Sequence, residues 1–96
     1  MGTIMKLIDV IRELESFDKE GIICATAPWT ENSPAIVIVE PKARRLPAEA
    51  ERLGMKYFLE VLIARDLLED WIANVASPPT LQEKCARLIK YAITDA

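Results

Sequence analysis

Apolar positions near the start of the chain recur at three- and four-residue spacing, and charged residues occupy most positions between them. This is the pattern of a helix with one buried face. The apolar set is Ile4, Leu7, Ile8, Ile11 and Leu14. Thr3 is a suitable N-cap, and the stretch "SFDKEG" that follows has the composition of a turn. The pattern therefore predicts an amphipathic helix over residues 4–14.

Two strands are predicted next. "IICATA", residues 22–27, starts with β-branched side chains, and "AIVIVE", residues 35–40, is the strongest strand signal in the chain. The stretch between them, residues 28–34, has proline at both ends and Thr, Asn and Ser inside, all of which favour turns. We expect a hairpin whose loop exceeds the usual length of about 2–5 residues, which leaves room for a functional tip.

The segment 55–63 fits two patterns. Alternation places Tyr57, Leu59, Val61 and Ile63 on one face of a strand, whereas helical spacing groups Met55, Phe58, Leu59 and Leu62 on one face of a helix. The helical stripe runs out of phase at Asp66, so a strand through Ile63 is preferred. A short helix between Pro47 and Gly54 precedes it, because proline suits a helix start and glycine a stop.

Two more helices are expected at the C-terminal end, each with a capping box. Asp66 and Glu69 form the first box, followed by the stripe Leu67, Leu68, Trp71, Ile72 and Val75. Thr80 and Glu83 form the second, followed by the stripe Leu81, Cys85, Leu88, Ile89 and Ala92.

These elements predict one α+β domain over residues 1–96, with the order α-β-β-(α)-β-α-α. Its three-stranded, mostly antiparallel sheet has amphipathic helices packed on one face. The run from Ile36 to Val39 is apolar at every position, so both faces of its strand need cover. Either helices cover both faces or a second copy of the chain does, and the patch suggests a homodimer.

Composition narrows the class of protein. The 96 residues are 51% hydrophobic and 28% charged, which is typical of a globular domain, and the net charge of −3 argues against general affinity for nucleic acid or an anionic membrane. The apolar runs are far shorter than the roughly 20 residues of a membrane span, and the first residues do not have the pattern of a signal peptide. A cytoplasmic location is expected.

The residue types available make catalysis a poor hypothesis. Histidine is absent, which removes the usual general base and the Ser-His and Cys-His nucleophile arrangements. Cys24 and Cys85 lie far apart in apolar surroundings and are expected to be small buried hydrophobes. The chain contains no phosphate-binding glycine motif. We therefore expect no enzyme activity, no metal site and no cofactor.

Trp29 lies in the hairpin loop with Thr30 and Asn32, and it has two interpretations. It is either a plug that folds back over the open end of the hairpin or a binding anchor, since tryptophan often carries much of the energy of an interface. A basic cluster, Lys42, Arg44 and Arg45, likewise is either a solvated crossover or a receptor for a phosphate, a carboxylate or an acidic partner.

The proline-tryptophan-threonine loop, the "AIVIVE" strand and "KYFLEVLIARDLLEDW" together resemble a family of small stand-alone bacterial domains of unknown function. The resemblance spans most of the chain and implies a bacterial source, but it supplies no catalytic or binding residues. The element order is also similar to that of double-stranded-RNA-binding domains. Their lysine-rich helix start is replaced here by "RDLLEDW" or "TLQEKC", so no site is carried over.

Three hypotheses for function follow. The leading one is a non-enzymatic protein-interaction module that self-associates and uses the Trp29 loop, with Arg44 and Arg45 as further contacts. The alternative is a small anionic-ligand-binding domain in which Lys42, Arg44 and Arg45 face the ligand and Trp29 or Tyr57 forms a flat wall. A nucleic-acid binder comes last because of the acidic charge balance.

Overall fold

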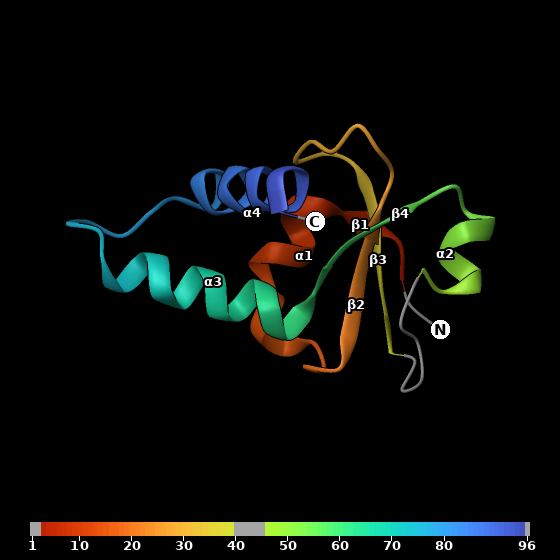
Figure 1. Ribbon diagram of the computed structural model, residues 1–96, viewed down its shortest axis with the longest axis horizontal. Coiled ribbons are helices and arrows are strands. Elements are labelled where there is room, and N and C mark those ends of the chain that lie inside the picture. Colours follow the sequence, from red (N-terminus) through yellow and green to blue (C-terminus); the bar gives the residue numbers. More distant parts are fainter. Residues whose placement is uncertain (1–2, 40–45, 96) are drawn as a thin grey trace.

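The computed structural model describes residues 3–39 and 46–95, and it confirms an α+β fold with an antiparallel sheet (Figure 1). The sheet has four strands in the order β1-β3-β2-β4, and every neighbouring pair is antiparallel. The elements are β1 (Met5–Lys6), α1 (Leu7–Arg12), the 3-10 helix η1 (Leu14–Ser16), β2 (Gly21–Ala25), β3 (Pro34–Val39), α2 (Ala48–Arg52), β4 (Lys56–Glu60), α3 (Val61–Ala73) and α4 (Leu81–Asp95).

The sheet has a fourth strand that the sequence pattern missed. β1 pairs with the start of β3 through Met5 opposite Ala35, so the predicted three-stranded sheet is wrong by this two-residue strand. The helix after it starts at Leu7 rather than Ile4 and is not capped by Thr3. Its first N–H groups donate instead to the hairpin loop, from Leu7 to the Ser33 carbonyl at 2.9 Å and from Ile8 to the Glu31 carbonyl at 2.9 Å.

The β2–β3 hairpin forms as predicted, with Gly21 opposite Val39 and Ala25 opposite Ala35. Gly21 has no room for a side chain, because an added Cβ would lie 2.7 Å from Cγ1 of Val37 and 3.2 Å from Cγ2 of Val61. Gly21, the last residue of the predicted turn "SFDKEG", is thus the first residue of β2, at a point where the start of α3 approaches the strand.

The segment 55–63 is a strand only over Lys56–Glu60, and α3 follows without a loop. A bulge in the β2–β4 pairing leaves Phe58 without a direct partner, and both Phe58 and Leu59 enter the main core. β4 stops because its partner β2 has only Gly21 left beyond the Ile22–Glu60 pair. The expected strand through Ile63 and the expected helix start at Asp66 are therefore both wrong.

Helices cover both faces of the sheet. The main core lies between the sheet and the helices α1, α3 and α4, whereas α2 packs on the opposite face (Figure 1). There Ala50 and Met55 cover the strand residues Ile22, Cys24 and Ile36. The first of the two alternatives predicted for the apolar run in β3 therefore holds for Ile36, whereas Val39 at the end of the run is 49% exposed, and the homodimer stays a prediction.

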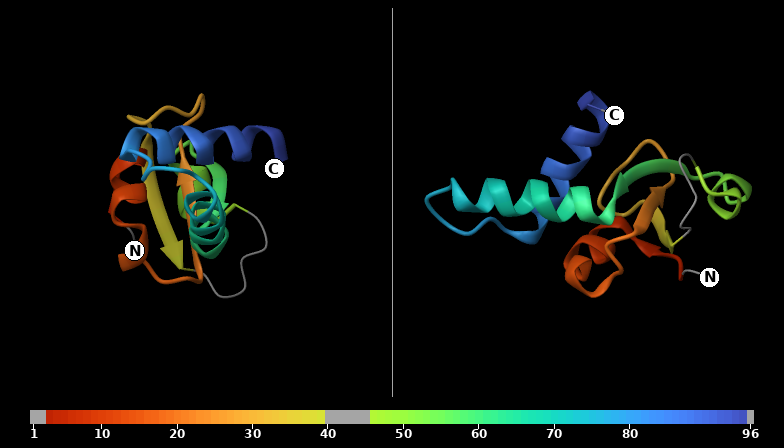
Figure 2. Two further views of the ribbon diagram at one scale, coloured as in Figure 1. Left: turned by 90° about the vertical axis from the view of Figure 1, so that its left-hand side faces the viewer. Right: turned by 60° about the horizontal axis from the view of Figure 1, so that its bottom comes forward.

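The second half of α3 and the turn into α4 project beyond the sheet (Figures 1 and 2). The molecule is accordingly elongated, with extents of 41 × 25 × 24 Å. The capping box at the start of α4 is confirmed, because Thr80 N–H donates to Glu83 Oε1 at 2.7 Å and Glu83 N–H donates to Thr80 Oγ1 at 3.1 Å. In the described part of the chain, none of the helices has the length and apolar character needed to cross a membrane.

Candidate functional site

Trp29 closes the open end of the β2–β3 hairpin. Its indole Nε1 donates to the carbonyl of Ala25 at 3.0 Å, and its ring packs perpendicular to that of Phe58, with 4.9 Å between centroids. The side chain is half-buried and packs against the main core. This is the geometry of the plug interpretation, and it leaves only part of the ring available to a partner.

The polar residues of the same loop hold its backbone in place. Ser33 Oγ accepts from the Thr30 N–H at 2.9 Å, and Thr30 Oγ1 accepts from the Asn32 N–H at 3.2 Å. Thr30 and Asn32 are exposed and lie in the same loop as Trp29. The other predicted site residues, Lys42, Arg44 and Arg45, lie outside the described residues.

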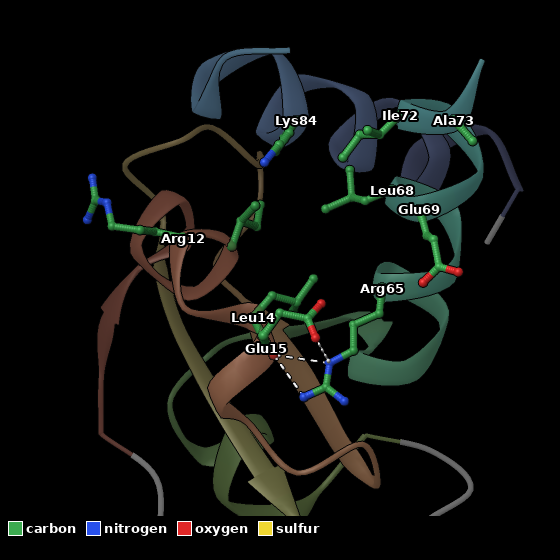
Figure 3. A pocket seen from close by; sticks show the side chains of 10 residues that line it. Arg12, Leu14, Glu15, Arg65, Leu68, Glu69, Ile72, Ala73 and Lys84 are labelled. Carbon is green, nitrogen blue, oxygen red and sulfur yellow. Dashed lines mark hydrogen bonds and ion pairs between the residues drawn. The ribbon is translucent and has the colours of Figure 1, made fainter. Parts of the chain in front are cut away.

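An open groove with a volume of about 410 Å³ lies between α1, η1, α3 and α4 (Figure 3). Leu68 and Ile72 point into it from α3, and Leu14 lies across from them on η1 (Figure 3). Ile11 of α1 also lines the groove. Three of these side chains are buried, but Ile72 is 39% exposed. We call this feature the α1–α3 groove; its lining residues are Ile11, Arg12, Leu14, Glu15, Arg65, Leu68, Glu69, Ile72, Ala73 and Lys84.

Charges of opposite sign stand on different sides of the α1–α3 groove. Lys84 reaches over it from α4, whereas Glu69 lies on the α3 wall and Glu15 below it on η1 (Figure 3). Arg12 lines the groove with its stem and points its guanidinium away, toward Asp9 of its own helix. Within the described part of the chain, neither Lys84 nor Glu69 has an ion-pair partner.

Arg65 is a structural part of this groove. Its guanidinium donates to the carbonyl of Leu14 from Nε at 3.2 Å and from Nη2 at 3.0 Å, and it also donates to the carbonyl of Phe17. Glu15 lies 4.0 Å away as a weak ion-pair partner. Arg65 thus adds a charged donor to two backbone carbonyls at the two ends of the η1 turn and ties α3 to this segment.

Two adjoining hollows lie elsewhere on the helices, one between another face of α3 and α4 and one along α4. The larger has a volume of about 290 Å³ and is lined in part by Trp71, Arg87 and Tyr91. The guanidinium carbon of Arg87 lies 5.1 Å from the ring centroid of Trp71, which is cation–π geometry. Lys90 joins Arg87 and Tyr91 around the adjoining hollow of about 250 Å³.

Both cysteines are buried free thiols, as the sequence predicts. Burial raises the pKa of Cys24 to about 11, and burial together with the charge of Glu31 raises the pKa of Cys85 to about 11. Both thiols are therefore protonated at neutral pH, which makes them poor nucleophiles. Over residues 3–39 and 46–95, no three Cys, Asp or Glu side chains are placed to hold a metal ion.

The sequence pattern did not predict the α1–α3 groove, because it placed Ile72 in one apolar stripe that was expected to face the core. The apolar residues of α3 actually span a broad arc: Leu67 and Trp71 lie on one flank, and Leu68 and Ile72 on the other. The width of that arc is a signal that a second apolar surface exists.

The fold and the groove together define a small α+β protein with an open apolar groove on its helical side. Comparison of the chain with protein-family models, with curated proteins and with solved structures finds no match. The function is therefore argued from the geometry of the chain itself.

Proposed function

We propose that this protein is a non-enzymatic protein-interaction module and that the α1–α3 groove is its recognition surface. The observation that carries the proposal is an open apolar groove of about 410 Å³ whose wall residue Ile72 is 39% exposed. Contiguous apolar surface open to water often marks an interaction site.

The distribution of polar groups favours a protein partner over a small molecule. A protein interface has an apolar centre and a polar rim, which is the arrangement of Ile11, Leu68 and Ile72 within Lys84 and Glu69. A small-molecule site instead needs polar groups that converge on the ligand. The guanidinium beside Leu14 belongs to Arg65 and already binds backbone carbonyls.

The Trp29 loop has a supporting part in this proposal. Its carbonyls at Glu31 and Ser33 accept hydrogen bonds from the first turn of α1, which forms one wall of the groove. Thr30 and Asn32 are exposed and remain candidates for contact with a partner at a separate surface.

Site-specific photocrosslinking tests the proposal. A photoreactive phenylalanine replaces Ile72 in the groove or, as the control, the exposed Glu51 of α2 on the other side of the sheet, and the protein is irradiated in its source cells. We expect a discrete crosslinked protein from position 72 that position 51 does not give. Equal or absent crosslinking at the two positions, with both variants folded by circular dichroism, contradicts the proposal.

The two adjoining hollows at α3 and α4 and along α4 support a second candidate, the binding of a small anionic ligand. Arg87 and Lys90 supply two cations there, and Trp71 and Tyr91 supply aromatic walls. A thermal-shift screen with phosphates, nucleotides and organic acids tests it, and stabilisation that survives in Arg87→Ala argues against this location. Nucleic acid remains the third candidate, and retention on DNA or RNA at low salt tests it.

A further inference from the structure

We infer that the occupant of the α1–α3 groove is a second copy of this chain, and that two grooves meet face to face around a two-fold axis. This inference rests on the proposed function, since it names the partner for the same surface. It uses a different surface from the apolar run of β3, of which α2 covers a part.

Charge complementarity selects a second copy as the occupant. Lys84 of α4 and Glu69 of α3 stand on opposite sides of the groove (Figure 3), and in the described part of the chain both are without an ion-pair partner. A two-fold axis directed along the groove brings the Lys84 side of one copy opposite the Glu69 side of the other. Two-fold symmetry repeats each contact, so one geometry forms two Lys84–Glu69 pairs.

The apolar lining fits the same arrangement. Face-to-face contact covers the exposed part of Ile72 on the α3 wall of each copy, and the Lys84–Glu69 pairs form beside it. Apolar centres with charged rims are the usual anatomy of such contacts. An acidic nucleic acid is a poor occupant, since Glu69 and Glu15 would face its phosphates.

Charge reversal with re-pairing tests the inference. Wild type, Lys84→Glu and Glu69→Lys are each measured by light scattering after size-exclusion chromatography, and the two variants are then mixed in equal amounts. We expect wild type at twice the chain mass of 10.8 kDa. In each variant alone, two like-charge contacts replace the two Lys84–Glu69 pairs. Its dimer should therefore dissociate at least about tenfold more readily than that of wild type, because like-charge contacts oppose association. In the mixture both pairs regain opposite signs, so the dimer should return.

The other outcomes overturn the inference. The inference is wrong if wild type stays monomeric up to about millimolar concentration. It is also wrong if each single variant dimerises like wild type, or if the mixture of the two variants does not form the dimer. Unchanged melting temperatures show that the variants fold, and Lys56→Glu, an exposed reversal on β4, is the matched control. If wild type is monomeric but position 72 crosslinks to a different protein, this inference fails while the proposed function stands. If position 72 crosslinks to nothing, both fail.

Discussion

The indole of Trp29 lies over the end of the β2–β3 hairpin, where it donates to the Ala25 carbonyl and contacts Phe58 edge to face. Aromatic pairs of this kind contribute about 0.5–1.5 kcal/mol beyond their buried area. At the scale of single residues, the position of the loop thus depends on Trp29, which packs against the core. The hydroxyl groups of Thr30 and Ser33 order only the backbone around it.

Trp29→Ala should destabilise the fold. The change removes the ring contact with Phe58 and leaves a gap beside the core, so we expect a loss of about 2–3 kcal/mol in the free energy of unfolding, below the range for fully buried aromatic residues. Trp29→Phe keeps much of the ring contact but loses the hydrogen bond to Ala25, and it should cost about 1 kcal/mol. Urea denaturation followed by circular dichroism measures both.

An unchanged stability of Trp29→Ala would contradict this role and return Trp29 to the anchor interpretation. The exposed loop residue Asn32 provides the control, because its side chain is not needed for the turn; Asn32→Ala should stay within about 0.5 kcal/mol of wild type.

At the scale of elements, segments that are distant in the sequence are held together by hydrogen bonds to backbone N–H and carbonyl groups. The hairpin loop accepts from the first N–H groups of α1, and Arg65 of α3 donates to the carbonyls of Leu14 in η1 and of Phe17 just after it. These contacts explain why α1 starts at Leu7 without a side-chain cap of its own.

Arg65→Ala should weaken the attachment of η1 to α3. The Leu14 and Phe17 carbonyls lose a charged donor, so we expect a loss of about 1–3 kcal/mol in the free energy of unfolding by urea denaturation. Arg65→Lys keeps the charge but not the fork of donors and should fall between wild type and Arg65→Ala.

Arg12→Ala is the matched control, because that guanidinium is exposed and pairs only with Asp9 on its own helix in the part of the chain described. Its loss should stay below about 1 kcal/mol. Equal effects of the two alanine substitutions would show that Arg65 acts as an ordinary surface charge.

At the scale of the whole molecule, the two cores lie on opposite faces of one sheet and each contains a cysteine. Cys85 lies in the main core and Cys24 in the smaller one under α2. Folding therefore removes both thiols from water, and the stability of the whole fold is linked to their protonation.

Stability should fall as the solution becomes alkaline. Burial raises the pKa of both thiols from 9.0 to about 11, so the folded protein retains protons that the unfolded chain releases in this range. The stabilisation is complete below pH 9 and is lost progressively up to about pH 11. Urea denaturation at pH 8, 9.5 and 10.5 measures the slope.

The double variant Cys24→Ala, Cys85→Ala should have a shallower slope in the same experiment. Some slope should remain, because burial and then the nearby charge of Glu60 raise the pKa of Tyr57 as well. An identical slope in wild type and the double variant would show that the thiols do not contribute.

Local chemistry made several features predictable. The β2–β3 hairpin follows from β-branched runs separated by prolines, and the start of α4 follows from the Thr80–Glu83 box. The boundary at Val61 was not predictable, because β4 ends where its partner strand ends, and that partner is distant in the sequence. The loop position of Trp29 was predicted from the sequence, and its role in binding stays a prediction; the α1–α3 groove was not anticipated.

The amino-acid sequence by itself determined which segments are amphipathic, where the turns fall and that both cysteines are buried, because these depend on the spacing and type of neighbouring residues. Tertiary structure alone decided three matters: the pairing of Met5 with Ala35, the burial of Trp29 against Phe58 and the exposure of Ile72. Each depends on which element lies opposite a side chain in the folded protein. That element is distant in the sequence, and the spacing of residues within one segment does not indicate which element it is.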